Sequence, residues 1–468
     1  MNEFLTAIAN GIAKIDGVIW GWPLIIILLG THLFLTLRLG FIQKYIGKAI
    51  KMSVTKDEEA QGDVSQFSAL ATALAATIGT GNIVGVATAV ALGGPGAVLW
   101  CWLTGVFGIA TKYTEAYLSV KFRVKTKDGT MAGGPMYVLE YGMKKKWLGV
   151  LFALFASIAA FGIGCMTQAN SISTLLETSY KVPTWISGVV MAVLTAVVIL
   201  GGIKSIAKVC DILVPFMAFF YIIGCIIILV IGRGTLGATV SAIFSTAFTG
   251  QAAIGGFAGA GVMYAMRYGV ARGLFSNESG LGSAPIVAAA AQTRNPARQA
   301  LVSSTGTFWD TVVVCAMTGL VIVNTGVWQQ GLKGAQLTHT AFNTIPVLGP
   351  IVLTVGLVTF VFSTILGWSY YGEKSIEYLL GKKAILPYRI AWVVFVFIGS
   401  VFSLQAVWDF ADLANGLMAL PNIISLLLLS GLVARETKMY MKGDNINMFC
   451  KDEIIVLGDE KNKRTVNQ

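Results

Sequence analysis

Long apolar segments recur along the whole chain and restrict its fold more than any other feature. Many reach about 20 residues, the length that an α-helix needs to cross about 30 Å of hydrocarbon. Only 12% of the 468 residues are charged, and the mean hydropathy is +0.74, whereas a soluble domain is about 25% charged. Transmembrane β-strands would give shorter segments of alternating hydrophobicity, a pattern that we do not find. The sequence therefore predicts an all-α, polytopic membrane protein.

The apolar segments predict eleven transmembrane helices. They span residues 18–38, 67–92, 96–120, 147–177, 184–202, 208–232, 236–266, 300–324, 348–371, 385–404 and 408–433. Lys and Arg divide unevenly between the loops: four fall on one side, 29 on the other, and one within a span. Because cytoplasmic loops carry an excess of Lys and Arg, we expect a plasma-membrane protein with its N-terminus outside and its C-terminus in the cytoplasm. The net charge of +11 then reflects these loops, and no nucleic-acid partner is expected.

Two of the predicted spans, 67–92 and 236–266, are interrupted by glycines. When the first span is set aside, the other ten form two sets of five, 67–232 and 236–433, which begin on opposite faces of the membrane. An inverted repeat requires that arrangement, and paired interrupted helices at matching positions indicate a transporter binding site. The sequence thus predicts one extra N-terminal helix followed by a 5+5 inverted repeat with two broken helices.

The first interruption, TIGTGNIVG at 77–85, exposes backbone groups that cannot be left facing lipid. Its freed N–H groups, at the start of the outer half-helix, suit an anion, and its freed carbonyls, at the end of the inner half-helix, suit a cation. An α-amino acid carries both charges on one carbon, so a single break can hold it by both ends.

Four motifs resemble those of the alanine/glycine:cation symporter family: GTGNIVGVATA, GGPGAVLWCW, GGPMY and, as the most distinctive, NESGLGSAP at 277–285. The segment IGTGN is also similar to the break of LeuT-type transporters in the amino acid–polyamine–organocation superfamily. The resemblance covers about 65–435 and implies sodium-coupled uptake of alanine or glycine by alternating access, not an enzyme. Na⁺ is the implied coupling ion, the amino acid and the bilayer are the implied partners, and no obligate protein partner is evident.

The polarity of the two ends of the chain, together with the range of the resemblance, predicts a domain organisation. We expect residues 1–64 to hold an amphipathic helix, the first transmembrane helix and a cytoplasmic amphipathic helix. Residues 65–434 would form the inverted-repeat transporter core, and 435–468 a charged cytoplasmic tail.

The substrate contacts that the resemblance implies centre on the first break. The backbone amides of Thr80 and Gly81 would bind the substrate carboxylate, and the carbonyl of Thr77 would face the ammonium. Further expected contacts are Asn82, Phe161, Gln168, Gly255, Gly256, Phe257, Met263 and Trp368. Phe161 and Gln168 are seven residues apart, which places them on one face of a regular helix.

The sodium ligands that the resemblance implies are the carbonyls of Ala75 and Ile78 and the hydroxyls of Ser363 and Thr364, a set of oxygens that suits a hard cation. The two hydroxyls have an alternative use, because hydroxyls in membrane helices commonly bond to a carbonyl one turn earlier. Asn82 stands where related transporters have a second sodium ligand. No carboxylate is evident beside it, so a second sodium would depend on the substrate's own carboxylate.

Three ionisable residues are expected at membrane depth. Lys112 and Glu115 are three residues apart and can pair on one helical face. Asp310 lies near the middle of its span, where an ionisable group is functional by default, although the resemblance gives it no role. The stretch 267–285 reads as a cytoplasmic connector or inner gate, in which Arg267 or Arg272 would pair with Glu278.

Other function classes remain as alternatives. A proton-coupled or exchange-type amino-acid transporter of the same superfamily would need a titratable group at the site, such as Asp310 or Glu115. A channel would conduct without substrate coupling. A membrane-embedded enzyme would need clustered His, Asp or Cys residues at membrane depth, and the spans show no such grouping.

Overall fold

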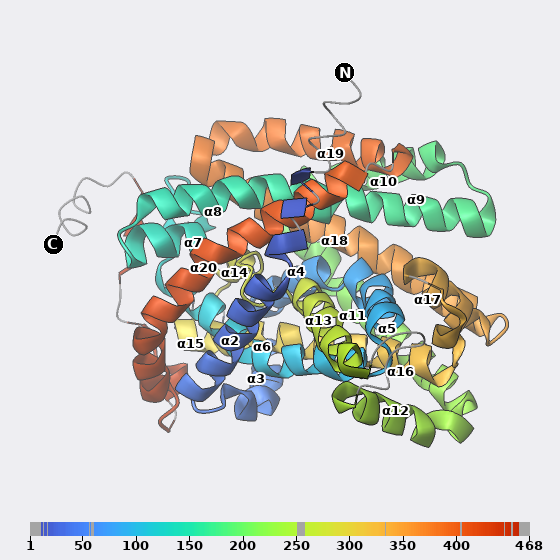
Figure 1. Cartoon of the computed structure of the whole chain (residues 1–468). Coiled ribbons are helices and arrows are strands. Elements are labelled where there is room, and N and C mark those ends of the chain that lie inside the picture. The colour runs from blue at the N-terminus through green and yellow to red at the C-terminus, as the bar shows by residue number, and fades with distance from the viewer. Residues whose placement is uncertain are drawn as a thin grey trace.

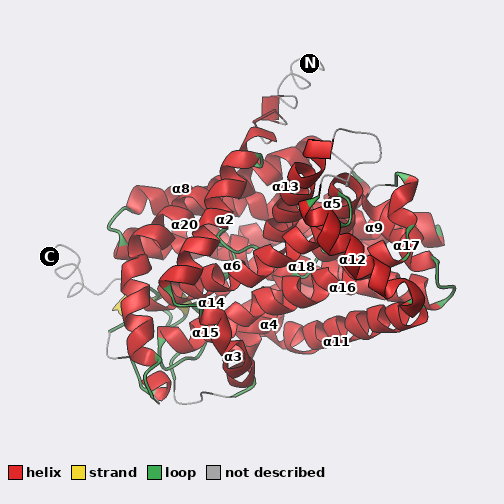
Figure 2. Ribbon diagram, turned by 60° about the horizontal axis from the view of Figure 1, so that its bottom comes forward, coloured by secondary structure: helices red, strands yellow, loops and turns green. Residues whose placement is uncertain are grey.

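The computed structural model describes residues 11–457 except 13, 16, 56, 58, 59, 250–257, 333, 403, 404, 444, 451 and 452. Figure 2 shows the described chain as almost entirely helical. The α-helices are α2 (Trp22–Arg38), α3 (Ile46–Ser53), α4 (Gln66–Thr77), α5 (Val86–Gly93), α6 (Gly96–Lys121), α7 (Pro135–Tyr137), α8 (Lys146–Ala159), α9 (Thr167–Tyr180), α10 (Thr184–Ile199), α11 (Gly202–Ile231), α12 (Leu236–Phe248), α13 (Ala258–Asn277), α14 (Pro285–Ala288), α15 (Pro296–Thr307), α16 (Ala316–Asn324), α17 (Gly334–Asn343), α18 (Leu348–Leu380), α19 (Ile385–Val401) and α20 (Gln405–Tyr440).

Short helices of other types and three short strands complete the described chain. The π-helices are η2 (Gly81–Gly85), η3 (Val138–Gly142), η4 (Ala160–Met166) and η7 (Phe308–Cys315), and the 3₁₀-helices are η1 (Ile42–Tyr45), η5 (Arg233–Thr235), η8 (Val327–Gln330), η9 (Lys382–Ala384) and η10 (Asn445–Asn447). The strands are β1 (Val124–Lys125), β2 (Met131–Ala132) and β3 (Ile455–Val456).

Helices occupy the predicted spans, with one exception at the seventh. Six described helices are long and apolar enough to cross a membrane by themselves, and two bent pairs raise the number to eight. The six are Lys146–Tyr180, Gly202–Ile231, Pro296–Asn324, Leu348–Leu380, Lys382–Val401 and Ala411–Tyr440. The count of eleven spans and the 5+5 repeat therefore remain predictions.

Apolar side chains are exposed along the outer helices. Val197 on α10 and Ile212 on α11 are each 72% exposed, and Ile390 on the neighbouring α19 is 56% exposed. Figure 1 shows α10 and α19 side by side along one edge of the molecule. Large exposed apolar surfaces are rare on soluble monomers, so these faces suit contact with lipid, as a multi-pass membrane protein requires.

The seventh predicted span, 236–266, differs from the structure. It is divided between α12 and α13, and residues 250–257 between these helices lie outside the described residues. Helix α13 continues to Asn277, where a second interruption follows at 278–284. The interpretation of 267–285 as a connector is therefore wrong, because its first eleven residues are helical and residues 276–285 are buried; the alternative of an inner gate stays a prediction.

The ends of the two broken helices meet on one side of the molecule. The N–H groups of Asp63 and Val64, just before α4, donate to the carbonyl of Ala290 at 2.7 and 3.2 Å. The N–H of Gln292 donates in return to the carbonyl of Val64 at 2.8 Å. The C-terminal tail reaches the same side, where β3 pairs in parallel with β1 and β1 pairs antiparallel with β2.

Candidate functional site

The first break has the form that the sequence predicts. Helix α4 ends at Thr77, and Ile78 is extended, with φ −77° and ψ 95°. The next helical segment begins at Gly81, and the two halves are bent by 51°. Gly79 allows α18 to approach, because a Cβ at this position would lie only 2.6 Å from Oγ1 of Thr364. The predicted interruption within 77–82 is therefore confirmed.

The four oxygens expected to bind sodium converge at this break. The hydroxyl of Thr364 lies 3.1 Å from the carbonyl oxygen of Ala75 and 3.3 Å from that of Ile78. The hydroxyl of Ser363 lies 3.2 Å from the same Ala75 oxygen. All four residues are almost fully buried. Residues nearly 300 positions apart in sequence thus form one small cluster of neutral oxygen atoms.

The alternative use of the two hydroxyls also occurs and does not exclude ion binding. Ser363 and Thr364 donate to the carbonyl of Phe360 at 2.8 and 3.0 Å. A hydroxyl has one proton and two lone pairs. When the proton bonds to Phe360, the lone pairs remain free to face a cation at the break.

A second polar cluster also lies at the break, and the sequence did not reveal it. Asn82 donates from Nδ2 to the Asp310 carboxylate at 2.6 Å and accepts at Oδ1 from the Gly79 N–H at 2.8 Å. Ser276 and Thr311 donate to the same carboxylate at 3.0 and 2.6 Å. Asp310 is therefore the carboxylate beside Asn82 that appeared to be missing. Asn82 and Asp310 are 228 positions apart in the sequence, so no local sequence pattern indicates their contact.

The residues expected to bind substrate are only partly brought together. Thr77, Thr80 and Gly81 are buried at the break, and Gly81 is the first residue of η2. Gln168 lies opposite: its Oε1 would be 3.5 Å from a Cβ built on Gly79, and this oxygen has no hydrogen-bond partner in the described chain. A buried amide oxygen without a partner can accept a hydrogen bond from a ligand.

Phe161 does not share a face with Gln168, contrary to the prediction. Its ring lies 4.8 to 5.4 Å from the rings of Tyr388, Trp392 and Phe395 on α19. Phe161 lies within the π-helix η4, which spans 160–166 and ends two residues before Gln168. A π-turn adds a residue to the helix, so a side chain within it and one that follows it lose the register that a regular α-helix would give them.

Trp368 contacts the second break, and its role as a substrate contact stays a prediction. Its Nε1 donates to Oε1 of Glu278 at 3.0 Å, and Ser283 also bonds to this carboxylate. The predicted pairing of Glu278 with Arg267 or Arg272 is wrong, because these guanidinium groups lie over the rings of Tyr268 and Phe275.

The second break is held by a buried carboxylate from another helix. Gly280 and Gly282 have positive φ angles of 92° and 89°, and their N–H groups donate to Oε1 of Glu115 at 3.0 and 3.1 Å. Asn422 donates to the same oxygen at 2.7 Å. The predicted Lys112–Glu115 pair is absent from the described chain, in which the Lys112 amine is buried without a hydrogen-bond partner.

Four expected substrate contacts come from the seventh predicted span. Gly255, Gly256 and Phe257 lie outside the described residues. Met263 is 53% exposed on α13, so the structure does not bring it to the buried break.

The comparison with protein families agrees with this geometry. The family described as the sodium:alanine symporter family matches residues 5–449. The chain belongs to that family.

Two relatives of this symporter family align over nearly the whole chain. The sodium/alanine symporter AgcS of Methanococcus maripaludis is 52% identical over 437 residues, which cover 91% of this chain and 96% of that protein. A Haemophilus influenzae protein named as a transporter is 49% identical over 449 residues, with coverage of 95% and 98%. The protein is thus a membrane transporter of the symporter type.

A comparison with solved structures shows the fold of this chain. The crystal structure of MhsT in complex with L-phenylalanine matches with a TM-score of 0.54 and 14% identity, covering 81% of this chain and 99% of that one. At this identity the match shows the fold alone, which is that of the LeuT-type transporters.

Proposed function

We propose that this protein is a secondary active transporter that couples the uptake of alanine and glycine to Na⁺ by alternating access. The observation that carries the proposal is the convergence of Ser363 and Thr364 on the carbonyls of Ala75 and Ile78. Four neutral oxygens at a helix break suit a hard monovalent cation, and the half-helix carbonyl dipole adds to the attraction.

The substrate would bind beside that cation. The helix N-terminus at Thr80 and Gly81 would take the carboxylate, and the Thr77 carbonyl and the Gln168 oxygen would accept from the ammonium. The role of Asn82 would be indirect, because its side chain is committed to Gly79 and Asp310. An ion that holds the break in shape favours substrate binding, and linkage makes the effect reciprocal.

Asp310 supports a second cation position within the same mechanism. Its carboxylate accepts hydrogen bonds from three side chains, those of Asn82, Ser276 and Thr311. A buried charge without a counter-ion is costly, so a Na⁺ ion beside Asp310 and the substrate carboxylate would lower that cost.

The distribution of Lys and Arg supports a cytoplasmic C-terminus in the plasma membrane. Arg267 and Arg272 no longer count as loop residues, because they lie within α13. Most of the remaining Lys and Arg residues are still predicted on the same side of the membrane as the C-terminal tail. In this orientation, the joined ends of the broken helices at Val64 and Ala291 form a closed cytoplasmic gate. The proposed division of the chain into an N-terminal part (1–64), a transporter core (65–434) and a cytoplasmic tail (435–468) is unchanged.

The decisive experiment is uptake of labelled alanine into proteoliposomes with and without an inward sodium gradient. Uptake should exceed the gradient-free level severalfold, and excess glycine should compete with alanine. Uptake that follows a pH gradient and ignores sodium would contradict the proposal. That result would favour the proton-coupled alternative, for which the buried Asp310 is the available group.

A further inference from the structure

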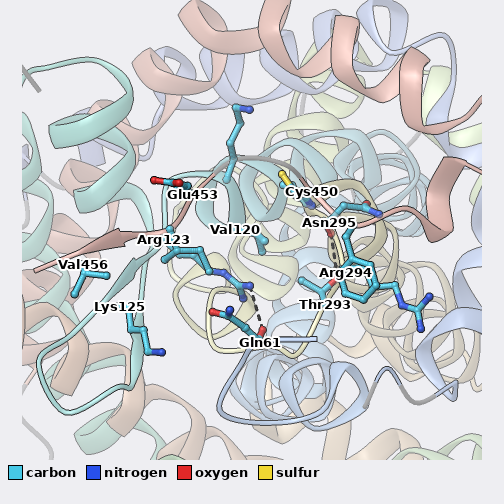
Figure 3. A pocket seen from close by; sticks show the side chains of 14 residues that line it. Gln61, Val120, Arg123, Lys125, Thr293, Arg294, Asn295, Cys450, Glu453 and Val456 are labelled. Carbon is cyan, nitrogen blue, oxygen red and sulfur yellow. Dashed lines mark hydrogen bonds between the residues drawn. The ribbon is translucent and has the colours of Figure 1, made fainter. Parts of the chain in front are cut away.

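A basic cavity of about 630 Å³ lies where the C-terminal tail packs against the transporter core (Figure 3). Its described lining includes four cationic side chains, Lys121, Arg123, Lys125 and Arg294, and a single acidic one, Glu453. Phe449 and Val456 of the tail complete the wall, so the cavity joins the tail to the loop after α6 and to the segment before α15.

Arg123 connects the ends of both broken helices, and no carboxylate of the described chain lies within ion-pair distance of its guanidinium. Its Nη1 donates to the carbonyls of Ala289 and Ala291 at 3.1 and 2.8 Å, and its Nη2 donates to that of Gln61 at 3.1 Å. Figure 3 shows this guanidinium directed at Gln61. The side chain is 6% exposed, and burial lowers its pKa to about 10. These hydrogen-bond partners are neutral and the carboxylate of Asp63 acts on Arg123 only from beyond ion-pair distance, so a bound anion would add direct counter-charge.

Lys125 is the second cation of the cavity without an ion pair in the described chain. Across the described residues, no carboxylate lies within ion-pair distance of its amine. In contrast, Lys121 pairs with Glu436 at 2.9 Å, and Arg294 pairs with Asp57 at 2.5 Å. Helix α15 begins at the cavity wall, and its dipole adds a partial positive charge there, although the Arg298 N–H is already bound by the Asn295 side chain at 2.9 Å.

We propose that this cavity binds a phosphate-bearing anion, either free in solution or carried by a lipid headgroup, and that the bound anion holds the joined ends of the broken helices together. Two cations without an ion pair in the described chain, Arg123 and Lys125, and a helix N-terminus suit a multiply charged anion of this kind. The cavity is complete only while the tail, Gln61 and the segment at 293–296 are assembled. A ligand that binds one arrangement favours it in proportion to that preference, so the anion would slow opening on this side. The predicted effect on uptake rests on the transport function proposed above, whereas the binding does not.

Binding is tested by thermal unfolding of the full chain in detergent, with pyrophosphate as the probe. Saturating pyrophosphate should raise the unfolding midpoint of the wild-type protein by about 2 °C or more. Lys125→Gln should lose at least half of this shift. Lys127→Gln is the matched control, because Lys127 is an exposed residue of the same loop outside the cavity, and it should keep the full shift.

A second arm separates the two sources of phosphate. The same variants are compared in nanodiscs of phosphatidylglycerol and of phosphatidylcholine without pyrophosphate. If the unfolding midpoint rises with phosphatidylglycerol but not with pyrophosphate, and the rise depends on Lys125, the site binds a lipid headgroup. If a rise that depends on Lys125 occurs with pyrophosphate, the site binds a free anion. Equal shifts in all variants, or no shift with either probe, would overturn the proposal.

Uptake tests the effect on the gate. Pyrophosphate on both sides of the proteoliposome should slow alanine uptake by wild-type protein and Lys127→Gln severalfold, and that by Lys125→Gln much less. Binding without slower uptake would contradict the role in gating. Absence of alanine uptake in every preparation would contradict the transport function and leave the binding result intact.

Discussion

The two interrupted helices differ in what satisfies their freed backbone groups. At the first break, the carbonyls of Ala75 and Ile78 contact neutral hydroxyls of α18. At the second, the N–H groups of Gly280 and Gly282 are bound by the carboxylate of Glu115, which belongs to the protein itself. The second break is thus occupied by the carboxylate of Glu115, whereas the oxygens of the first break can bind an external ion. We infer that the first break binds ligands and that the second is a fixed support.

Removal of the internal anion should have the largest effect. Glu115→Ala leaves three buried donors without an acceptor, and each costs about 1–3 kcal/mol. We therefore expect the free energy of unfolding to fall by about 3 kcal/mol or more and alanine uptake to be lost. Thermal unfolding in detergent measures the loss. Glu115→Gln keeps one oxygen acceptor and should be milder. An alanine variant with a wild-type midpoint would show that this carboxylate does not support the second break.

Substitution of Gly81 should remove substrate binding at the first break. A Cβ on Gly81 would lie 3.3 Å from Cα of Ser276 and 3.4 Å from Cδ1 of Phe275, so the branched side chain of Gly81→Val would displace the amides that face the substrate. We expect alanine affinity to fall by about 100-fold, with elution on size exclusion unchanged. Gly85→Val is the control, because the nearest atom there is 3.9 Å away. Wild-type affinity in Gly81→Val would refute the carboxylate assignment.

Loss of one hydroxyl at the first break should weaken sodium binding selectively. Thr364→Val keeps the shape of the side chain and removes one ligand oxygen, so the sodium concentration for half-maximal uptake should rise by about 10-fold. The ratio of alanine to glycine uptake should not change. Thr359→Val is the control, because this hydroxyl bonds to Val355 and Gly356 within the same helix. An unchanged sodium dependence in Thr364→Val would exclude Thr364 as a ligand.

The smallest effect should come from the contact between α18 and the second break. Trp368→Phe removes the hydrogen bond to Glu278, which should cost about 1 kcal/mol of stability. The apparent affinities for alanine and glycine should change by about 3-fold at most. If the preference between alanine and glycine changed by more than this, Trp368 would contact the substrate, as the sequence analysis expected. The second break would then also take part in ligand binding.

Local sequence patterns predicted the helices and the first break well. Length and hydropathy set most helix boundaries within a few residues, because each span must satisfy its own backbone in lipid, but helices α11, α13, α18 and α20 extend six or more residues beyond the predicted spans. The pair of glycines at 79 and 81 indicated the break for the same reason. Short runs of small and polar residues were ambiguous: NESGLGSAP, at 277–285, was interpreted as a cytoplasmic connector or inner gate, and its packing around the buried Glu115 was not predicted.

The side chains at the site could be predicted only in part. Ala75, Ile78, Ser363 and Thr364 came from a family resemblance and are adjacent in the structure. The contact between Asn82 and Asp310 was missed, since nothing local connects residues so far apart.

By itself, the sequence determined that this chain is a helical membrane protein with a break at 77–82, because apolar length and glycine act within a few residues of each position. The tertiary structure alone decided which ionisable groups meet the two breaks. Glu115 and Asp310 take their partners from other helices, and only helix packing brings them there. The π-turn before Gln168 acts in the same way: one extra residue changed the register of a helix whose regular periodicity had placed Phe161 beside it.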